Sequence, residues 1–525
     1  MRALKYWTYF DFAPLRSIGR QFERNEQIRR MKSKTNSWFC KALLISSLMT
    51  VLLPTGVAAQ EFDLGTLTLQ ESIELAQENS PVARANRYSL ISSRWAFESF
   101  KADLYPSLSL SGDAPNFNKS IFTNRLDDGT LTFASQRQSD ASTSVSIDQN
   151  ILPSGGRLSL SSGITRLGIF AGENTYRWQS TPLVVGLQQP IFQFNNLKWR
   201  NRLEPLRYEI AQKEFVQEME SLAVQVTDGF FDIFLARINV ENAEFNVARN
   251  DSIYTISQGR YQVGNIAEND LLQTELALRN AESSLTRSRI EYQRALNNFK
   301  ILLGYTTDVS LSLEAPDDLP DINVDIELAK QLAYDNNSEA LTYRFNEILA
   351  DRDFAEAKKE AGFSATLQAN YGLNQTSTDF KDLYSNPQNR QFITVGFNIP
   401  IFNWGKARAE VNAARNQQRQ VANSIEYQRN QFLQEVEYQV SQFIQLKDQV
   451  LLAAQSDTIA QRRYEVAQNR YLIGRIDITN LFIAQNEKDA ARRAYIQTLG
   501  DYWMGWYALR QLTLYNFRED EMITY

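Results

Sequence analysis

The chain holds few residues of the types that carry out chemistry. Its 525 residues include no histidine, so the commonest general base and the commonest metal ligand are both missing. Cys40 is the only cysteine, and one thiol cannot form a disulfide within the chain. The sequence contains no nucleophile paired with a base, no glycine-rich phosphate loop and no cluster of metal-ligand residues. We therefore predict no catalytic residue, no metal site and no cofactor.

The charge balance argues against nucleic acid as a partner. Lysine and arginine number 55, and aspartate and glutamate number 61, which gives a formal net charge of −6. A nucleic-acid-binding domain usually carries a basic stripe with interleaved aromatic residues, and no such stripe occurs here. We expect the scattered carboxylates to lie on solvated faces of helices.

One motif occurs twice, at positions that are 210 residues apart. The sequence Arg-Tyr-Gln-Val-Gly at 260–264 returns as Arg-Tyr-Leu-Ile-Gly at 470–474, and Pro-Ile-Phe at 190–192 returns at 400–402. The spacing from proline to glycine is the same in both copies, since 264 − 190 = 474 − 400 = 74. A flexible loop would tolerate insertions over such a span, whereas a rigid helix would not. The sequence therefore predicts a tandem duplication in which each unit contains one long helix of fixed length.

Long helices are the elements that position the repeated motif. Residues 201–258 contain only Pro205 and Gly229 as helix breakers, and about 58 helical residues would be about 87 Å long. We expect further helices at about 268–303, 405–469 and 477–512. Their surfaces are rich in Gln, Asn, Arg and Glu, with a narrow apolar stripe. This pattern is typical of an antiparallel coiled coil with much wet surface, and a solvated structural rod is the alternative.

Segments with a period of two lie before the long helices. In 363–374 and 392–399, apolar residues alternate with small or polar ones. This alternation predicts strands with lipid on one side and water on the other, and an ordinary half-buried sheet would give the same pattern.

The first 59 residues resemble targeting sequence. Lys32 and Lys34 precede an apolar stretch at 42–53, and small residues follow at 57–59. We predict a secretory signal peptide that is cleaved after Ala59; a short membrane anchor is the alternative. Met31 would be a sensible start for this signal, so 1–30 would be an over-extended gene start or a removed leader. No apolar run of 18 residues follows position 59, so we expect no membrane-spanning helix.

The order of these segments resembles the TolC family of outer membrane efflux proteins. The residues that carry the resemblance are the Leu-x-Leu-x-x-Ser-Ile-x-x-Ala-x-x-Asn-x-Pro opening at 67–81, the strand ends at Pro190 and Pro400, and the turns at Gly264 and Gly474. The match extends over 61–515 and is duplicated. The resemblance implies an α+β membrane protein: a trimeric outer-membrane β-barrel continued by a long periplasmic α-helical coiled-coil tunnel, internally duplicated.

The resemblance also divides the chain into segments. The expected segments are a leader and signal peptide (1–59), a first repeat (60–304), an equatorial linker (305–325), a second repeat (326–515) and a C-terminal tail (516–525). Each repeat would hold a short helix, strands and a long helical hairpin.

The first repeat is longer than the second in its strand region. The span from Pro106 to Pro190 is 84 positions and the span from Ser364 to Pro400 is 36, an excess of 48. Alternating segments around Pro-Ser-Gly-Gly at 153–156 predict a hairpin within 144–163. Either it adds two transmembrane strands with a periplasmic turn, giving six strands per protomer and an 18-stranded barrel, or it extends outside the cell above a 12-stranded barrel. We expect the polar stretch 117–138 to be a surface loop in both cases.

The function implied by the resemblance is passive transport. The protein would be an outer membrane exit duct, with a periplasmic extension, of a tripartite efflux or type I secretion system. Its partners would be two further copies in a homotrimer, outer membrane lipid, a periplasmic adaptor protein and an inner membrane pump of the RND or ABC type. The alternative is a periplasmic coiled-coil scaffold or adaptor without a pore. Alternating strands after a signal peptide favour the duct.

The resemblance places the functional surface at the helix-hairpin tips. Arg260, Gly264, Arg470 and Gly474 are the expected adaptor-docking residues. Each glycine would let the chain reverse tightly where a side chain would obstruct the turn.

A periplasmic gate is also implied near the tips. The expected gate residues are Asp270, Tyr471, Arg475, Asn480 and Ile483. Asp270 and Tyr471 fall where some family members link the two hairpins, and Arg475 lies beside the usual arginine position. Asn480 and Ile483 occupy positions that carry an acidic ring in other members. Because neither side chain can bind cations as a carboxylate ring does, we predict a less cation-selective closed pore.

Overall fold

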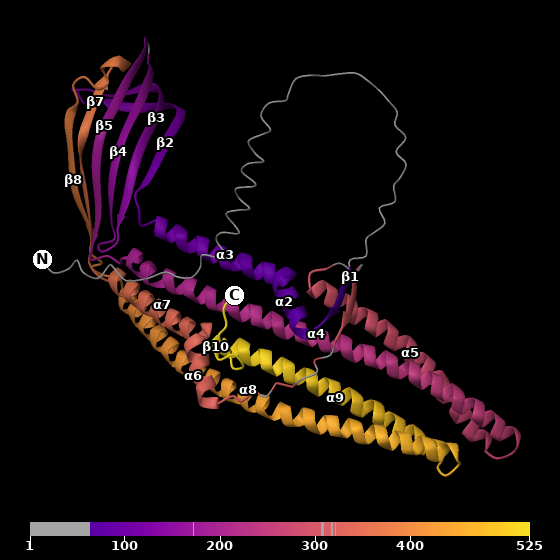
Figure 1. The fold of residues 1–525 in the computed structure, drawn as a ribbon. Coiled ribbons are helices and arrows are strands. Elements are labelled where there is room, and N and C mark those ends of the chain that lie inside the picture. Colours follow the sequence, from indigo (N-terminus) through magenta and orange to yellow (C-terminus); the bar gives the residue numbers. More distant parts are fainter. Residues whose placement is uncertain (1–62, 172, 306–308, 315, 317–318, 321) are drawn as a thin grey trace, which may run out of the picture. The chain divides into compact units, whose positions relative to one another are not determined.

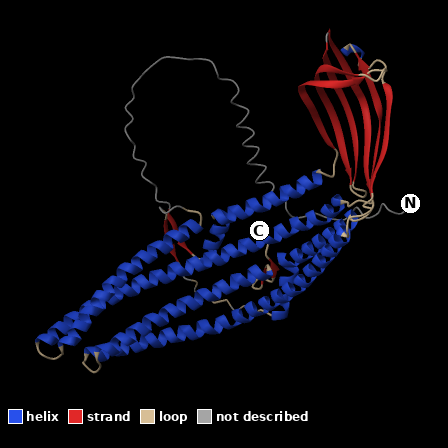
Figure 2. Ribbon diagram, turned by 180° about the vertical axis from the view of Figure 1, so that it is seen from behind, coloured by secondary structure: helices blue, strands red, loops and turns tan. Residues whose placement is uncertain are grey.

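The computed structural model describes residues 63–525, apart from 172, 306–308, 315, 317–318 and 321. The expected signal peptide therefore lies outside the described residues. The described chain consists of a single six-stranded sheet, two small two-stranded sheets and a set of helices, four of which are long (Figure 1; Figure 2). No helix in this part of the chain is both long enough and apolar enough to cross a membrane.

The two long helices that lead into the repeated glycine turns have the same length. Helices α4 (Asn196–Gln262) and α8 (Lys406–Leu472) each contain 67 residues, and both their first and last residues are 210 positions apart. The prediction of one rigid helix of fixed length in each unit is confirmed. Each helix turns back into a partner, α5 (Glu268–Leu302) or α9 (Ile478–Thr513), and packs along it (Figure 1).

Shorter helices precede the strands in each repeat. They are α2 (Leu69–Asn79) and α3 (Pro81–Ala102) in the first repeat, and α6 (Ile326–Asn336) and α7 (Ser338–Glu360) in the second. Thr68 caps α2 in a reciprocal capping box with Glu71, and Pro81 occupies the first turn of α3, where no amide donor is needed. Asn337 both ends α6 and caps α7.

Two small sheets lie outside the large one. Strand β1 (Asp63–Leu67) pairs in parallel with β6 (Ser310–Leu313), so the expected equatorial linker contains a strand. Strands β9 (Tyr515–Asn516) and β10 (Glu521–Met522) form an antiparallel pair close to the C-terminus.

The large sheet is antiparallel throughout, in the order β2-β3-β4-β5-β7-β8. Its strands are β2 (Ser107–Arg125), β3 (Leu131–Ile151), β4 (Gly156–Ala171), β5 (Glu173–Ile191), β7 (Ser364–Ser377) and β8 (Gln388–Asn398). The prediction of a surface loop over 117–138 is wrong, because β2 and β3 continue through it and only 126–130 form a turn. The polar residues there pair across the strands, as Lys119 does with Arg137, so their polarity reflects exposure and not a break in the strand.

The predicted hairpin within 144–163 is confirmed, and it lies inside the sheet. Strands β3 and β4 pair continuously, from Gln138 opposite Ile169 at one end to Ile151 opposite Gly156 at the other. Their turn lies against the start of α4, since the Asn195 side-chain amide donates to the Leu152 carbonyl oxygen over 3.0 Å. An extension that stands clear of the sheet is therefore contradicted within this chain.

The main core lies where the long helices pass the shorter ones. Phe230 and Phe299 are buried between α4 and α5, and the ring of Phe443 stacks on Tyr502 of α9 at 5.2 Å. This core also includes apolar residues of α2, α6 and β6. The apolar stripes of the helices therefore face one another here, as the pattern of an amphipathic helix requires.

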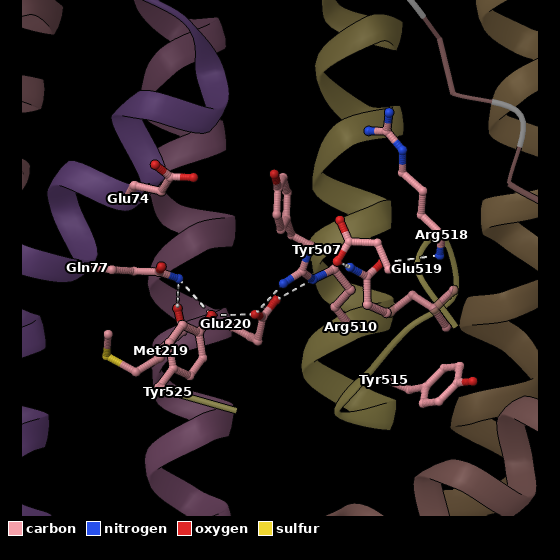
Figure 3. Close-up of polar contacts among 12 residues, drawn as sticks. Glu74, Gln77, Met219, Glu220, Tyr507, Arg510, Tyr515, Arg518, Glu519 and Tyr525 are labelled. Atoms are coloured by element: carbon pink, nitrogen blue, oxygen red, sulfur yellow. Dashed lines mark hydrogen bonds and ion pairs between the residues drawn. The ribbon is translucent and has the colours of Figure 1, made fainter. Parts of the chain in front are cut away.

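A buried ion pair ties the C-terminus to this core (Figure 3). Glu220 of α4 is fully buried and accepts hydrogen bonds from Nε and Nη2 of Arg510, over 2.9 and 2.8 Å. The hydroxyl of Tyr525 also donates to Glu220, and Gln77 of α2 donates to that hydroxyl over 2.8 Å. Burial and the adjacent Glu220 charge raise the pKa of Tyr525, so its hydroxyl stays protonated and remains a donor.

Replacing Arg510 tests how much this ion pair stabilises the fold. The Arg510→Met variant leaves the Glu220 carboxylate buried without its cation, which should lower the free energy of unfolding by about 3–5 kcal/mol. Denaturant or thermal unfolding in detergent would measure the loss. Adding Glu220→Gln to Arg510→Met should recover part of it, because the buried charge is then gone.

The matched control is Arg493→Met, which removes an exposed arginine from the same helix and should change stability by less than about 0.5 kcal/mol. If Arg510→Met proved no more harmful than this control, the ion pair would not stabilise the fold.

Candidate functional site

Both long hairpins end in the same turn. In the first, the Gly264 amide donates to the Tyr261 carbonyl over 2.9 Å, and the Asn265 amide donates to the Arg260 carbonyl over 2.8 Å. The second repeats this pattern one for one, with Gly474 and Arg475 as the donors, each over 2.9 Å. These paired bonds are the Schellman arrangement, which satisfies the last carbonyls of a helix.

Glycine is required at these turns because of the backbone angle and not because of crowding. The φ angles are +76° at Gly264 and +70° at Gly474, a left-handed conformation that costs other residues about 1–2 kcal/mol. A Cβ at either position would meet nothing within 4 Å. The expectation that a side chain would obstruct the turn is therefore wrong, and the space around both glycines is open.

The second helix of each hairpin starts differently. The Asp477 carboxylate caps α9 by accepting from both the backbone and the side-chain amide of Asn480, over 2.8 and 2.9 Å. Helix α5 has Ala267 at its N-cap position and therefore no side-chain cap, and Glu268 and Asp270 lie in its first turn. Negative charge there is favourable because it faces the positive end of the helix dipole. Asn480 thus supports its own helix, and the exposed Ile483 lies one turn further along.

Tyr471 joins the two hairpins close to the tips. Its side chain is buried, and its hydroxyl lies 3.4 Å from the Ser257 hydroxyl on α4. The Arg260 guanidinium lies 5.5 Å from the centre of the Tyr471 ring and also donates to the Leu472 carbonyl over 3.2 Å. Arg260 and Tyr471, for which the sequence predicts different roles, are therefore in contact with each other.

The apolar surroundings of Tyr471 come mostly from the second hairpin. The cluster consists of Ile253 of α4 with Tyr464, Tyr471, Ile478, Leu481 and Ala484 of α8 and α9. Ile253 is thus the part of the first hairpin that enters this cluster.

The other predicted gate residues make fewer contacts within the chain. Among the described residues, the Asp270 side chain has no hydrogen-bond or ion-pair partner, so the expected link from Asp270 to the second hairpin does not exist in a single chain. The polar link between α5 and α9 is instead a 3.4 Å hydrogen bond from Gln273 to Thr479. Arg470 and Arg475 are exposed.

Sequence reasoning missed a second contact between the hairpins, further from the tips. Lys488 and Asp489 of α9 are buried, with Lys488 Nζ 3.1 Å from Asp489 Oδ1. Asn246 of α4 donates to the other carboxylate oxygen over 2.8 Å. Lys488 Nζ also lies 4.9 and 5.2 Å from the ring centres of Phe245 and Tyr464. One charged pair is therefore enclosed between the two hairpins.

Several polar atoms in this contact have no hydrogen-bond partner. In the described part of the chain, these include the side-chain oxygens of Asn246, Asn250 and Gln485, all of which are buried. A buried polar group left unpaired costs about 1–3 kcal/mol, so the contact between the hairpins holds less tightly than an apolar one would. The signal was present in the sequence, since Gln485 and Lys488 continue the helical spacing of Ile478 and Leu481.

Comparisons with known proteins identify the family and the fold. The family model described as outer membrane efflux protein matches residues 72–305 and 350–513, which is more than half of the chain. No curated protein is significantly similar in sequence.

Solved structures share the fold at low sequence identity. The CmeC outer membrane channel of Campylobacter jejuni is 14% identical, with a TM-score of 0.61 over 90% of this chain and 94% of that chain. VceC of Vibrio cholerae is 14% identical, with a TM-score of 0.60 over 85% and 95%. The open state of MtrE from Neisseria gonorrhoeae is 14% identical, with a TM-score of 0.54 over 85% and 88%. The predicted α+β channel fold is confirmed. The chain therefore belongs to the outer membrane efflux protein family and is an outer membrane channel with a periplasmic extension.

Proposed function

We propose that three copies of this chain form a passive exit duct, which carries out no reaction of its own. The duct serves a tripartite efflux or type I secretion system, in which an inner membrane pump of the RND or ABC type supplies the energy and a periplasmic adaptor connects pump and duct. The family membership supports the channel, and the large sheet supports its assembly from several copies.

The observation that carries this proposal is that the sheet has two free edges. In the described chain, β2 pairs only with β3, and β8 pairs only with β7. Unpaired backbone groups cost several kcal/mol each in lipid, so an open sheet cannot remain there. Pairing β8 of one copy with β2 of the next removes every edge.

One face of this sheet suits lipid. Val185 of β5, Tyr371 of β7 and Val395 of β8 are large apolar side chains that are exposed in the single chain. Residues that alternate with them, such as Gly186 and Asn370, are small or polar. A periplasmic scaffold without a pore would hold such a face in water, where large exposed apolar patches are rare. The scaffold alternative is therefore disfavoured.

The hairpin tips suit an adaptor. Val263 and Ile473 precede the two turn glycines and are 70% and 65% exposed. Together with the open space at Gly264 and Gly474, they leave two similar apolar tips per chain, and Arg470 is exposed beside the second. We assign adaptor docking to both tips. Arg260 also takes part in the gate, because it contacts Tyr471.

The gate is the contact between the two hairpins. In this proposal Tyr471, Ser257 and Arg260 hold the hairpins together, and the tunnel opens when α8 and α9 move away from α4. Asp270, which has no side-chain partner among the described residues of one chain, acts against the neighbouring copy.

Membrane extraction and planar-bilayer recording test the exit duct. The mature protein should stay in the membrane fraction through salt and carbonate washes, enter solution only with detergent, and form ion-conducting channels in a lipid bilayer. Release by salt alone, together with an absence of channels, would establish the scaffold alternative.

Substitution of Tyr471 tests the gate. The Tyr471→Ala variant removes the hydroxyl contact and a cation–π contact worth about 0.5–1 kcal/mol, so single-channel conductance should rise several-fold. Tyr471→Phe keeps the ring and should give a smaller rise. Tyr427→Ala removes an exposed tyrosine from the same helix and should leave conductance unchanged. Equal conductance of Tyr471→Ala and wild type would exclude Tyr471 from the gate. Asp270→Ala should likewise raise conductance, and unchanged conductance would exclude Asp270 from the gate.

The absence of an acidic ring predicts weak block by metal ions. Multivalent cations applied at the tip side should reduce wild-type current only slightly, since Asn480 and Ile483 carry no charge. The Asn480→Asp variant places one carboxylate per copy near the axis and should gain block at low cation concentration. Strong block of the wild type would contradict the assignment of these positions.

A further inference from the structure

The hairpin of β3 and β4 has no counterpart in the second repeat, where β7 and β8 suffice. We propose that this inserted hairpin is part of the lipid-spanning wall, so that three copies close a barrel of 18 strands. The proposal rests on the proposed trimeric duct and goes beyond it, because it fixes the width of the pore in the membrane.

The strand register places one continuous apolar row across five of the six strands, β2 to β7; in β8 the residue opposite Tyr371 is Gln391. Along this row Leu108 lies opposite Ile147, Ile147 opposite Leu160, Leu160 opposite Val185, and Val185 opposite Tyr371. All five side chains are exposed, from 38% at Leu160 to 72% at Leu108. Ile147 and Leu160 belong to the inserted strands. The hairpin therefore carries the same lipid-type face, at the same level, as the strands on both sides of it.

The opposite face of the inserted strands is hydrophilic. Asp148 lies opposite Ser159, which lies opposite Gly186 and then Asn370 in the next strands. On the neighbouring pair of strands, the hydroxyl oxygens of Ser109 and Ser146 are 2.9 Å apart. Hydroxyl and carboxylate groups on one face and apolar groups on the other are the pattern of a strand between lipid and a water-filled lumen. A hairpin surrounded by water on both sides would need no such division.

Aromatic residues border the apolar row on the side away from the helices, and the inserted strand supplies one of them. The ring of Phe170 in β4 lies 6.1 Å from Phe117 of β2 and 6.1 Å from Tyr176 of β5. The Arg166 guanidinium, also in β4, lies 4.4 Å from the Tyr176 ring centre. Aromatic girdles lie at the two interfaces of outer membrane barrels, so β4 reaches the far interface in line with its neighbours.

The near end of the hairpin lies at the helical side of the sheet. The turn at 152–155 contacts Asn195, the residue that caps α4, and the Gln189 side chain donates to the Ser154 carbonyl over 3.1 Å. The inserted strands thus extend from the level of the start of α4 to the aromatic residues around Phe170. A barrel's diameter grows roughly in proportion to its number of strands, so 18 strands give a pore about 1.5 times as wide as 12.

Single cysteines can locate the inserted hairpin relative to lipid. On a Cys40→Ser background the chain has no other thiol. The variants Leu160→Cys and Ser159→Cys place a thiol on the two faces of β4, and Val185→Cys and Gln188→Cys do the same on β5. Each would be reconstituted in liposomes, treated with a water-soluble maleimide that cannot cross membranes, and compared with the exposed turn variant Asn386→Cys.

We expect Ser159→Cys and Gln188→Cys to react, and Leu160→Cys and Val185→Cys to stay unreacted until the protein is denatured. Reaction of Leu160→Cys at the rate of Asn386→Cys, with Val185→Cys still protected, would overturn the placement of the inserted strands in lipid and leave the proposed duct intact. Reaction of both Leu160→Cys and Val185→Cys would mean that the sheet is not in lipid, and the proposed function would fail with this inference.

Discussion

A β-sheet in lipid cannot leave a strand edge unpaired, and this constraint determines the rest of the assembly. The chain folds a sheet of six strands whose outer strands, β2 and β8, have no further partner in the described residues. Closure must come from other copies, and those copies bring their helices with them. When the sheets of several copies close into a barrel, the helices of those copies stand side by side below it and form the wall of a tunnel.

The second constraint is that the two hairpins of each chain end together. Helices α4 and α8 each contain 67 residues. A single residue inserted into one of them would rotate every later side chain by about 100° and move the tip by about 1.5 Å. The equal lengths bring Tyr471 opposite Ser257 and Arg260, at the ends of helices from different repeats. The gate proposed here therefore depends on both helices having the same length. The partly unpaired polar contact around Asp489 keeps the cost of separating the hairpins low.

Features with a local cause were predictable from the sequence. The turns at Gly264 and Gly474, the helix starts at Pro81 and Ser338, and the alternation of β7 and β8 depend on neighbouring residues alone. Features that depend on packing between distant segments were missed. The Glu220–Arg510 pair joins positions 290 residues apart, and the spacing that places Lys488 on the buried stripe of α9 does not say that α4 supplies the partner Asn246 for the adjacent Asp489. The stretch 117–138 is polar, as a loop would be, but its polarity is that of exposed strands which continue beyond the apolar row.

The central claim is that three copies close one barrel of 18 strands, which continues into a helical tunnel. A cryo-electron microscopy map of the detergent-extracted protein tests it most directly. We expect threefold symmetry, 18 strands around the pore, and hairpin tips that meet at the far end of the tunnel. A barrel of 12 strands would contradict the role given to β3 and β4, and separate chains without a barrel would contradict the duct itself.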